Sequence, residues 1–468
     1  MAGHRATARG TLSGWLASAL LLMILALASL PPPGNLTVPA YRAIWVAAAA
    51  VVLWTSEILP AGITAVLVVL ILGLSGASPS LAGALSGFSN PVAYFFIGVL
   101  TLAMAVEKVG LAERIARFFL RGARGEPRPL YWQMIISFPL ITFLLPSAVT
   151  RSAILVHVYD RAFSLGGVAK GAPIARAVMM GLGSLNRLAS TALLTGGMTP
   201  IVAAGLIGGI GWGRWFAMLA VPYYVTLAIG AWSIYIWYTR GGEGSLLRPA
   251  DENPPLQNPE VRTAAIVLAA SALWLTDALH HLSPAVPALL AWTLLLSPRI
   301  GVLSWREFES RFPWANFFIL ASSLSLGHAI SETGAAKWLA QGLIQMAPAV
   351  ASRPYFLLGA ILLACIPIRL LVPSITGFLA IAIPIGMEIG RAAGLNPVAC
   401  GLAVMIIGDA VLFYPAQSAS ALAVYERGHL TAAEIFRFGL FMTAVAFLVT
   451  MTFNLMWWDF VGLSWRNS

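Results

Sequence analysis

The sequence predicts an all-α polytopic membrane protein with about 11 transmembrane helices of about 20 residues each. Of its 468 residues, 59% are hydrophobic and only 10% are charged, whereas soluble domains are about 25% charged. Apolar windows long enough to cross a bilayer as helices recur along nearly the whole chain. The two halves of the chain also repeat a series of short motifs in the same order. Internal repeats of this kind are typical of secondary transporters.

The formal net charge of +10 does not indicate a nucleic-acid partner. The arginines and lysines lie mostly in short loops between apolar windows, where basic residues act as topology signals. Cys365 and Cys400 lie inside apolar segments, which supports neither a disulfide framework nor a cysteine metal cluster. We therefore expect a multi-pass protein surrounded by membrane lipid.

The first expected element is a retained helix over 12–30, within an N-terminal helix and loop that end at residue 42. This apolar run is long for a signal peptide, and multispanning proteins rarely need one removed. Two of the later windows, 176–209 and 396–425, are expected to be broken within the membrane. The further expected spans are 43–58, 61–77, 91–107, 152–168, 176–209, 214–238, 262–279, 284–298, 313–330, 376–392, 396–425 and 436–457.

Two weaker apolar stretches, 132–146 and 354–373, are expected to form re-entrant helical hairpins. Prolines interrupt both stretches, which disfavours a continuous crossing; these are Pro139, Pro146, Pro367 and Pro373. The long polar connection 240–261 divides the chain into a first repeat, 43–239, and a second repeat, 262–468.

The repeats are recognised from paired motifs and are expected to have opposite topology. The pairs are WTSE at 54–57 with WLTD at 274–277, YFFI at 94–97 with NFFI at 316–319, and LPS at 145–147 with VPS at 372–374. The segment 111–128 carries five arginines, whereas its counterpart 335–353 carries only Lys337 and Arg353. The basic segment is typical of an amphipathic helix on the cytoplasmic surface. With a cytoplasmic N-terminus, the connection 240–261 lies inside and the two hairpins enter from opposite sides.

The expected substrate site lies at the hairpin tips. Hydroxyl groups and freed amides at helix starts favour an anion such as a carboxylate or sulfate, because the positive ends of the helix dipoles point at it. Alternatively, these hydroxyls bond the preceding helical turn. The candidates are Ser147, Thr150, Arg151 and Ser152 after Pro146, and Ser374, Thr376 and Gly377 after Pro373.

Arg151 is the sharpest single candidate, because a guanidinium in an apolar stretch is costly unless it has a partner. We expect it to contact the substrate directly, to form a salt bridge with Asp160, Glu388 or Asp409, or to snorkel to a membrane interface. Thr199 and Ser418 lie at the expected helix breaks and are further substrate candidates, and Asp409 and Arg187 are candidates for a proton or charge relay. Candidate cation ligands are Ser147, Gly196, Gly197, Ser374 and Ser420. The glycines are equally typical of helix packing.

From Trp54 to about Gly439 the chain resembles the divalent anion:sodium symporter (DASS) family. The resemblance rests on FSNP at 88–91, GLAERIA at 110–116, WREF at 305–308, PW at 313–314, YP at 414–415, ERGH at 426–429 and FG at 438–439. It implies an inverted-repeat carrier, usually homodimeric, whose transport domain moves by an elevator-like step. Family substrates are di- and tricarboxylates, such as C4-dicarboxylates and citrate, or sulfate, and many are coupled to sodium.

The chain departs from the family's Ser-Asn-Thr triplets, which bind substrate and sodium at the hairpin tips. They fall on SAV at 147–149 and SIT at 374–376, so both asparagines are missing. A hard cation needs most of its hydration shell replaced by oxygens, so the usual sodium sites are in doubt. The stretch with Pro146 and Ser147, followed by Thr150 and Arg151, resembles the corresponding stretch in sodium-independent dicarboxylate exchangers of the family. A fixed arginine would then balance the substrate charge in place of Na+. If the protein is instead an ion-coupled symporter, Na+ is the candidate coupling ion. No cofactor is expected.

The leading hypothesis is a carrier of small dianions in the cytoplasmic membrane, working as a sodium-independent exchanger or as an ion-coupled symporter. A cation/proton antiporter or oxyanion efflux carrier of the same superfamily is the alternative if Asp409 is the essential residue. The alternatives from other classes are a membrane-embedded enzyme and a non-transporting sensor. The chain has no nucleotide loop, no zinc-spaced cluster and no Ser/His/Asp arrangement, so no enzyme activity is expected.

Overall fold

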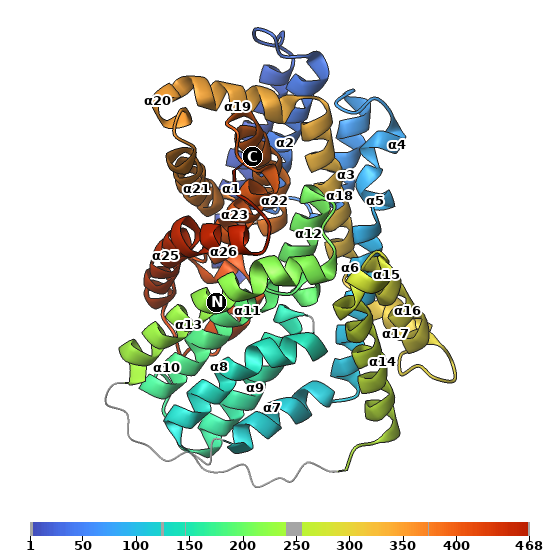
Figure 1. The fold of residues 1–468 in the computed structure, drawn as a ribbon, viewed down its shortest axis with the longest axis vertical. Helices are drawn as coiled ribbons and strands as arrows, with labels where there is room; N and C mark the ends of the chain where they lie inside the picture. Colours follow the sequence, from blue (N-terminus) through green and yellow to red (C-terminus); the bar gives the residue numbers. More distant parts are fainter. Residues whose placement is uncertain (1–2, 123–125, 146, 240–254, 373, 467–468) are drawn as a thin grey trace.

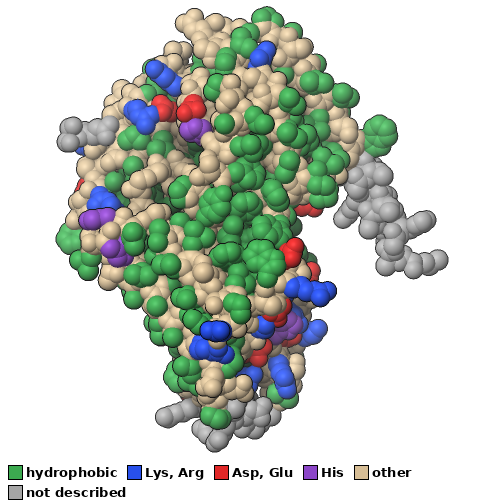
Figure 2. Space-filling model, turned by 90° about the vertical axis from the view of Figure 1, so that its right-hand side faces the viewer, with side chains coloured by type: hydrophobic (Ala, Val, Ile, Leu, Met, Phe, Trp, Pro, Cys, Tyr) green, Lys and Arg blue, Asp and Glu red, His purple; other side chains and the backbone are tan. Residues whose placement is uncertain are grey.

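The computed structural model describes residues 3–122, 126–145, 147–239, 255–372 and 374–466. These residues are helical, with one isolated antiparallel bridge between Leu395 and Arg466. Hydrophobic side chains cover the middle of the face drawn in Figure 2, and charged side chains gather toward its lower end and at its upper left. The helices that are long and apolar enough to cross a membrane are Val38–Ser56, Pro91–Lys108, Trp212–Tyr238, Pro354–Leu371, Ile375–Ala392 and Ala432–Phe460.

The first group of helices comes from the start of each half. In the first half these are α1 (Gly3–Ala28), α2 (Val38–Ser56), α3 (Ala61–Leu74), α4 (Leu81–Ala84), α5 (Ser86–Ser89) and α6 (Pro91–Lys108). In the second half they are α14 (Asn258–Leu275), α15 (Asp277–His280), α16 (Ala285–Leu296), α17 (Trp305–Arg311) and α18 (Trp314–Glu332). The halves interlock, because α6 packs on α16 and α18 packs on α3. At Gly98 on α6, an added Cβ would lie 2.4 Å from the Ala288 carbonyl oxygen, so the two backbones meet closely.

Two shorter amphipathic helices lie at opposite ends of the molecule: α7 (Leu111–Gly122) near the bottom of Figure 1 and α19 (Ala335–Met346) near the top, where α19 is followed by α20 (Pro348–Ala351). At the α7 end, Arg114 bonds Glu260 at 2.9 Å. At the same end, the Lys108 ammonium lies 2.5 Å from the Glu307 carboxylate and, together with Ser304, lowers the pKa of Glu307 to about 2. The placement of α7 and α19 agrees with the expected opposite topology, which stays a prediction.

Each hairpin consists of two 18-residue helices: α8 (Pro127–Leu144) with α9 (Ala148–Leu165), and α21 (Pro354–Leu371) with α22 (Ile375–Ala392). The stretches 152–168 and 376–392, expected as separate spans, are thus the second helices of the hairpins. Pro139 and Pro367 lie inside helices that continue through them, because neighbouring helices stabilise the freed backbone groups. The first helices end at Leu144 and Leu371, and the second helices begin at Ala148 and Ile375; Pro146 and Pro373 themselves lie outside the described residues.

A broken helix follows each hairpin, as the sequence predicts. The first is built from α10 (Pro173–Met180), a π-helical turn η1 (Gly181–Leu185), α11 (Asn186–Thr191), a 3₁₀ turn η2 (Leu194–Gly196) and α12 (Met198–Ile207). The second is built from α23 (Pro397–Ala410), the 3₁₀ turn η3 (Pro415–Gln417) and α24 (Ala419–Tyr425). Both breaks end one helix and begin another within the buried part of the protein, where the groups of a helix end need partners from outside the helix.

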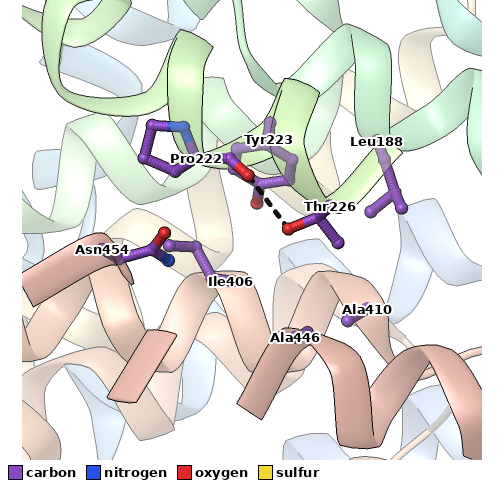
Figure 3. A pocket seen from close by; sticks show the side chains of 8 residues that line it. All are labelled: Leu188, Pro222, Tyr223, Thr226, Ile406, Ala410, Ala446 and Asn454. Atoms are coloured by element: carbon purple, nitrogen blue, oxygen red, sulfur yellow. Dashed lines mark hydrogen bonds between the residues drawn. The ribbon is translucent and has the colours of Figure 1, made fainter. Parts of the chain in front are cut away.

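Each half ends in a long helix: α13 (Trp212–Thr239) in the first, and α25 (Ala432–Val449) continued by the π turn η4 (Thr450–Asn454) and α26 (Leu455–Phe460) in the second. Figure 3 shows the contact of these helices with α11 and α23, where Tyr223, Thr226 and Asn454 point toward one another. The Thr226 hydroxyl donates to the Pro222 carbonyl at 2.9 Å. The space between these side chains has no room for a water molecule, so this is a packed contact and not a binding site.

Candidate functional site

A cavity of about 490 Å³ lies where one hairpin and both broken helices face α6 and the α17–α18 corner. The hairpin contributes its tip, residues 147–150. The broken helices contribute the breaks themselves, residues 196–200 and 417–420. The opposite wall is largely apolar and comes from the Phe96 to Glu107 side of α6 together with Arg311, Pro313 and Asn316. The cavity therefore lies between the interlocked helices and the group formed by the hairpins and broken helices.

Helix starts surround this cavity. The N-terminal residues of α9, α12 and α24 line it, and Ile375 at the start of α22 lines it as well. Ser147 caps α9 by accepting from the Thr150 amide at 3.3 Å and from the Thr150 hydroxyl at 3.0 Å. Ser374 caps α22 in the same way, accepting from the Gly377 amide at 3.3 Å and lying 3.0 Å from the Thr376 hydroxyl. The positive ends of several helix dipoles thus point toward one enclosed space.

The structure brings eight of the candidate residues together at this cavity: Ser147, Thr150, Arg187, Gly196, Gly197, Thr199, Ser418 and Ser420. The second hairpin is represented there by Ile375, and its candidates Ser374, Thr376 and Gly377 do not line the cavity. An added Cβ at Gly377 would lie 2.8 Å from Trp54 on α2, so this start of α22 packs against the interlocked helices. Arg151, Ser152 and Asp409 are fully buried behind the cavity wall.

Arg151 holds the first hairpin tip to the first broken helix. Its Nη1 donates to the Leu145 carbonyl at 2.8 Å, and its Nε donates to Asn186 Oδ1 at 2.6 Å. Its Nη2 donates to the Asn186 carbonyl at 3.1 Å and to the Ser190 hydroxyl. Asn186 in turn donates to Ser152 Oγ at 2.7 Å. Of the roles considered for Arg151, the structure shows neither a salt bridge to Asp160, Glu388 or Asp409 nor a position in the cavity wall.

Arg369 holds the second hairpin tip to the second broken helix, and the sequence analysis missed it. Its Nη1 donates to the Val372 carbonyl at 2.6 Å and its Nε to the Gly408 carbonyl at 3.1 Å. Gln417, at the edge of the cavity, donates to the Arg369 carbonyl at 3.3 Å. The signal was present in the sequence, because Arg369 lies in an apolar stretch four residues before Pro373, where an ionisable residue is by default functional.

Asp409 joins the two broken helices. Its carboxylate lies 3.3 Å from Arg187 Nη1 and accepts from the Thr191 hydroxyl at 2.8 Å and from the Thr199 hydroxyl at 3.4 Å. Thr191 precedes the break in the first broken helix and Thr199 follows it. The carboxylate is completely buried, whereas the Arg187 side chain is 12% exposed at the cavity. These contacts place the two relay candidates in one ion pair.

An ion pair between Glu107 on α6 and Arg311 on α17 lies at the edge of the cavity, with 3.0 Å between Glu107 Oε1 and Arg311 Nη2. Both side chains are about half exposed, so water and salt screen the pair. This pair was not among the sequence candidates. It marks the open edge of the cavity, on the side of the molecule that carries α7.

A second cavity of about 440 Å³ lies on the other side of α12, between Gly208–Gly211 and the segment from His281 to Ala285. Among the described residues, no Asp, Glu, Lys or Arg side chain lines it. The charged groups of the hairpins and broken helices therefore belong to the first cavity.

The residues at the hairpin tips fit a cation poorly. A cation at a tip would use the tip carbonyls as ligands, yet the Leu145 and Val372 carbonyls each accept from a guanidinium. Within the described part of the chain, no group of three or more His, Cys, Asp or Glu side chains is placed to hold a metal ion. The donor set of the cavity, made of hydroxyls, helix-start amides and guanidinium groups, instead suits an anion.

Comparison with known proteins points to the same class. Residues 12–464 match the family described as the sodium:sulfate symporter transmembrane region. The chain is 26% identical to a membrane protein of Cupriavidus necator, over 95% of this chain and 92% of that protein. It is 23% identical to the L-tartrate/succinate antiporter of Escherichia coli K12, over 84% of this chain and 83% of the antiporter.

Two solved transporter structures share the fold. MtrF of Neisseria gonorrhoeae, described with a class of antimetabolite efflux pumps, matches with a TM-score of 0.55 at 14% identity, over 96% of this chain and 94% of MtrF. The YdaH transporter of Alcanivorax borkumensis matches with a TM-score of 0.52 at 15% identity, over 80% of this chain and 87% of YdaH. Both likenesses concern the architecture of the chain.

Proposed function

Because the chain belongs to the sodium:sulfate symporter family, the DASS family of membrane transporters, we propose that it exchanges small dianions across the cytoplasmic membrane without sodium. C4-dicarboxylates are the favoured substrates, because the relatives named above include L-tartrate/succinate antiporters. Family and relatives are transporters, which points to transport rather than catalysis.

The balance of charge behind the cavity carries this proposal. Arg151, Arg187 and Arg369 contribute three positive charges, and Asp409 contributes one negative charge. Arginine keeps its proton inside proteins, so the group carries a net charge of two. A net charge inside a low-dielectric protein is costly unless it is compensated. A bound dianion cancels it, whereas a monoanion leaves part of it uncompensated.

The helix starts add to this preference. Ser147 and Thr150 present hydroxyls at the first amides of α9, and Thr199 does so at the start of α12. Amides at a helix start bind carboxylate and sulfate oxygens because they have no partner within the helix. A C4-dicarboxylate has two carboxylates separated by a short apolar chain, which suits a cavity with polar helix breaks on one side and an apolar α6 wall on the other.

The arginines also support exchange rather than sodium symport. In a symporter, mobile cations leave together with the substrate, so the empty carrier returns without net charge. Here the compensating charges are covalently fixed, and the empty carrier keeps its two positive charges. Its return across the membrane is therefore unfavourable unless another dianion binds, which makes exchange the expected mode.

We extend the proposal to orientation and movement. The cavity opens beside Glu107 and Arg311, on the side of the basic helix α7, which we assign to the cytoplasm together with the N-terminus. The described state is then inward-open, and an elevator-like shift of the hairpins and broken helices against α6 and α18 would open the site outward. A homodimer built through the interlocked helices completes the proposal.

Counterflow in proteoliposomes tests the substrate class. Labelled succinate is added outside vesicles loaded with unlabelled succinate, L-tartrate, sulfate or citrate. We expect strong uptake with internal succinate or L-tartrate. If internal sulfate or internal citrate drives uptake as strongly as internal succinate or L-tartrate, or more strongly, the substrate is another dianion or a trianion. No uptake with any of the four would overturn the transport proposal.

A further inference from the structure

Arg187 and Asp409 form the one acid–base pair within the group of Arg151, Arg187, Arg369 and Asp409. Arg187 lies on α11 and Asp409 on α23, so the pair bridges the two broken helices, with 3.3 Å between Nη1 and Oδ1. Asp409 is completely buried, but Arg187 lies in the cavity wall. Its Nε has no hydrogen-bond partner among the described residues. This Nε is buried, and it is the 12% exposed remainder of the side chain, in the cavity wall, that an anion can contact.

Among the described residues, Asp409 is also the one completely buried carboxylate beside the charged residues of the broken helices. The other buried carboxylate of the described residues, Glu260, pairs with Arg114 at the far end of α14. Arg151 and Arg369 keep their charges at the two hairpin tips, where they donate to backbone carbonyls. The net charge that a bound anion meets thus depends on whether position 409 carries a negative charge and whether position 187 carries a positive one.

We propose that the Arg187–Asp409 pair sets the valence of the transported anion. This inference rests on the proposed dianion transport and assigns its charge selectivity to two named residues. Asp409 reduces the net charge of the group from three to two, and Arg187 raises it from one to two. A dianion is selected because it brings the moving group to neutrality. Substitutions at these two positions then change the preferred valence in opposite directions.

The matched variants follow from this arithmetic. Arg187→Gln leaves a net charge of one and favours monoanions. Asp409→Asn leaves a net charge of three and favours trianions, while an asparagine oxygen still accepts from the Thr191 and Thr199 hydroxyls. The double variant Arg187→Gln/Asp409→Asn returns the net charge to two although both ionic side chains are gone. Arg187→Lys keeps the charge and serves as the conservative control.

The experiment measures how three anions of similar carbon skeleton compete with labelled succinate in proteoliposome exchange: the monoanion succinamate, the dianion succinate and the trianion tricarballylate. Ligand-induced thermal stabilisation of each purified variant with the same three anions provides a second readout that needs no transport. We expect wild type, Arg187→Lys and the double variant to prefer succinate. Arg187→Gln should shift the preference at least tenfold toward succinamate, and Asp409→Asn at least tenfold toward tricarballylate.

An unchanged preference for succinate in both single variants would overturn the valence assignment. A double variant that binds all three anions alike would also overturn the valence assignment. If the pair were purely structural, replacing both residues would damage the site most, and the preference for succinate would be lost. A wild-type protein that exchanges and binds none of the three anions would instead overturn the proposed function itself, so the two failures are distinguishable.

Discussion

Arg151 and Arg369 hold the two hairpin tips by the same contact. Each donates its Nη1 to the carbonyl of the residue directly before the tip proline, Leu145 at 2.8 Å and Val372 at 2.6 Å. The two arginines come from different positions, because Arg151 lies on the second helix of its hairpin and Arg369 on the first helix. Both tips therefore carry a guanidinium that donates to the last carbonyl before the tip proline.

The Arg151 contact predicts a strong effect of neutral substitution. Arg151→Gln leaves the Leu145 carbonyl and the Asn186 side chain without their charged donor, and we expect a loss of about 1–3 kcal/mol of stability. Arg151→Lys keeps the charge, but its single ammonium cannot reach from the Leu145 carbonyl to Asn186 and Ser190 as the planar guanidinium does, so we expect an intermediate loss. Thermal unfolding in detergent and succinate exchange measure both effects. Stability and exchange equal to wild type in Arg151→Gln would contradict the assigned role.

The two capping serines are predicted to differ in their effect on substrate affinity. Ser147 caps α9 and lines the cavity, whereas Ser374 caps α22 away from it. Loss of either cap costs about 1 kcal/mol of stability. Only Ser147→Ala also removes a hydroxyl from the site. With succinate added on the side to which the cavity opens, its KM should rise about fivefold, because a lost hydrogen bond to the substrate costs about 1 kcal/mol. Equal KM values in Ser147→Ala and Ser374→Ala would contradict this geometry.

The two adjacent glycines of the first break provide a matched pair. An added Cβ at Gly196 would lie 1.7 Å from the Ser190 carbonyl oxygen, whereas at Gly197 nothing lies within 4 Å. Ser190 is also a partner of Arg151. Gly196→Ala must displace this backbone and should abolish exchange, at a cost of about 1–3 kcal/mol or more in stability. Gly197→Ala should retain exchange within about twofold, since its effect on stability is well below 1 kcal/mol. Exchange rate and thermal unfolding measure both effects. Similar behaviour of the two variants would argue against the described break.

The pair at the cavity edge is expected to tune affinity weakly. Glu107→Gln frees Arg311 to attract anions, and Arg311→Gln frees Glu107 to repel them. Because both side chains are half exposed, each change should alter the KM for a dianion by less than about fivefold, in opposite directions. The difference should shrink as ionic strength rises. Shifts in the same direction, or shifts independent of salt, would show that the pair acts through structure.

The architecture was largely accessible from the sequence, because it rests on local patterns. The repeated LPS and VPS motifs located both chain reversals, and the glycines near 196 and the polar run near 417 located both helix breaks. The helix partners of the hairpins were misjudged, since α9 and α22 are apolar enough to suggest independent spans. A proline inside a helix was also read as an interruption at Pro139 and Pro367, although surrounding helices allow the helix to continue.

The contacts at the site were less accessible, because they join residues far apart in the chain. Asp409 meets Thr191 across 218 residues, a pairing that depends on how the two broken helices pack. Arg151 was recognised as important, but its partners, Asn186 and Ser190, come from another helix. The separation of Ser374 from the cavity goes with the packing of the start of α22 against Trp54 on α2. Periodicity and motif spacing carry no information on that packing.

Counterflow in sodium-free medium tests the central claim most directly. Proteoliposomes are prepared with or without internal succinate, and uptake of labelled succinate is measured with external sodium or with choline in its place. If fixed arginines balance the dianion, uptake requires internal succinate and is the same in both media. Uptake that depends on sodium, or that is as fast into vesicles without internal anion, would contradict the account.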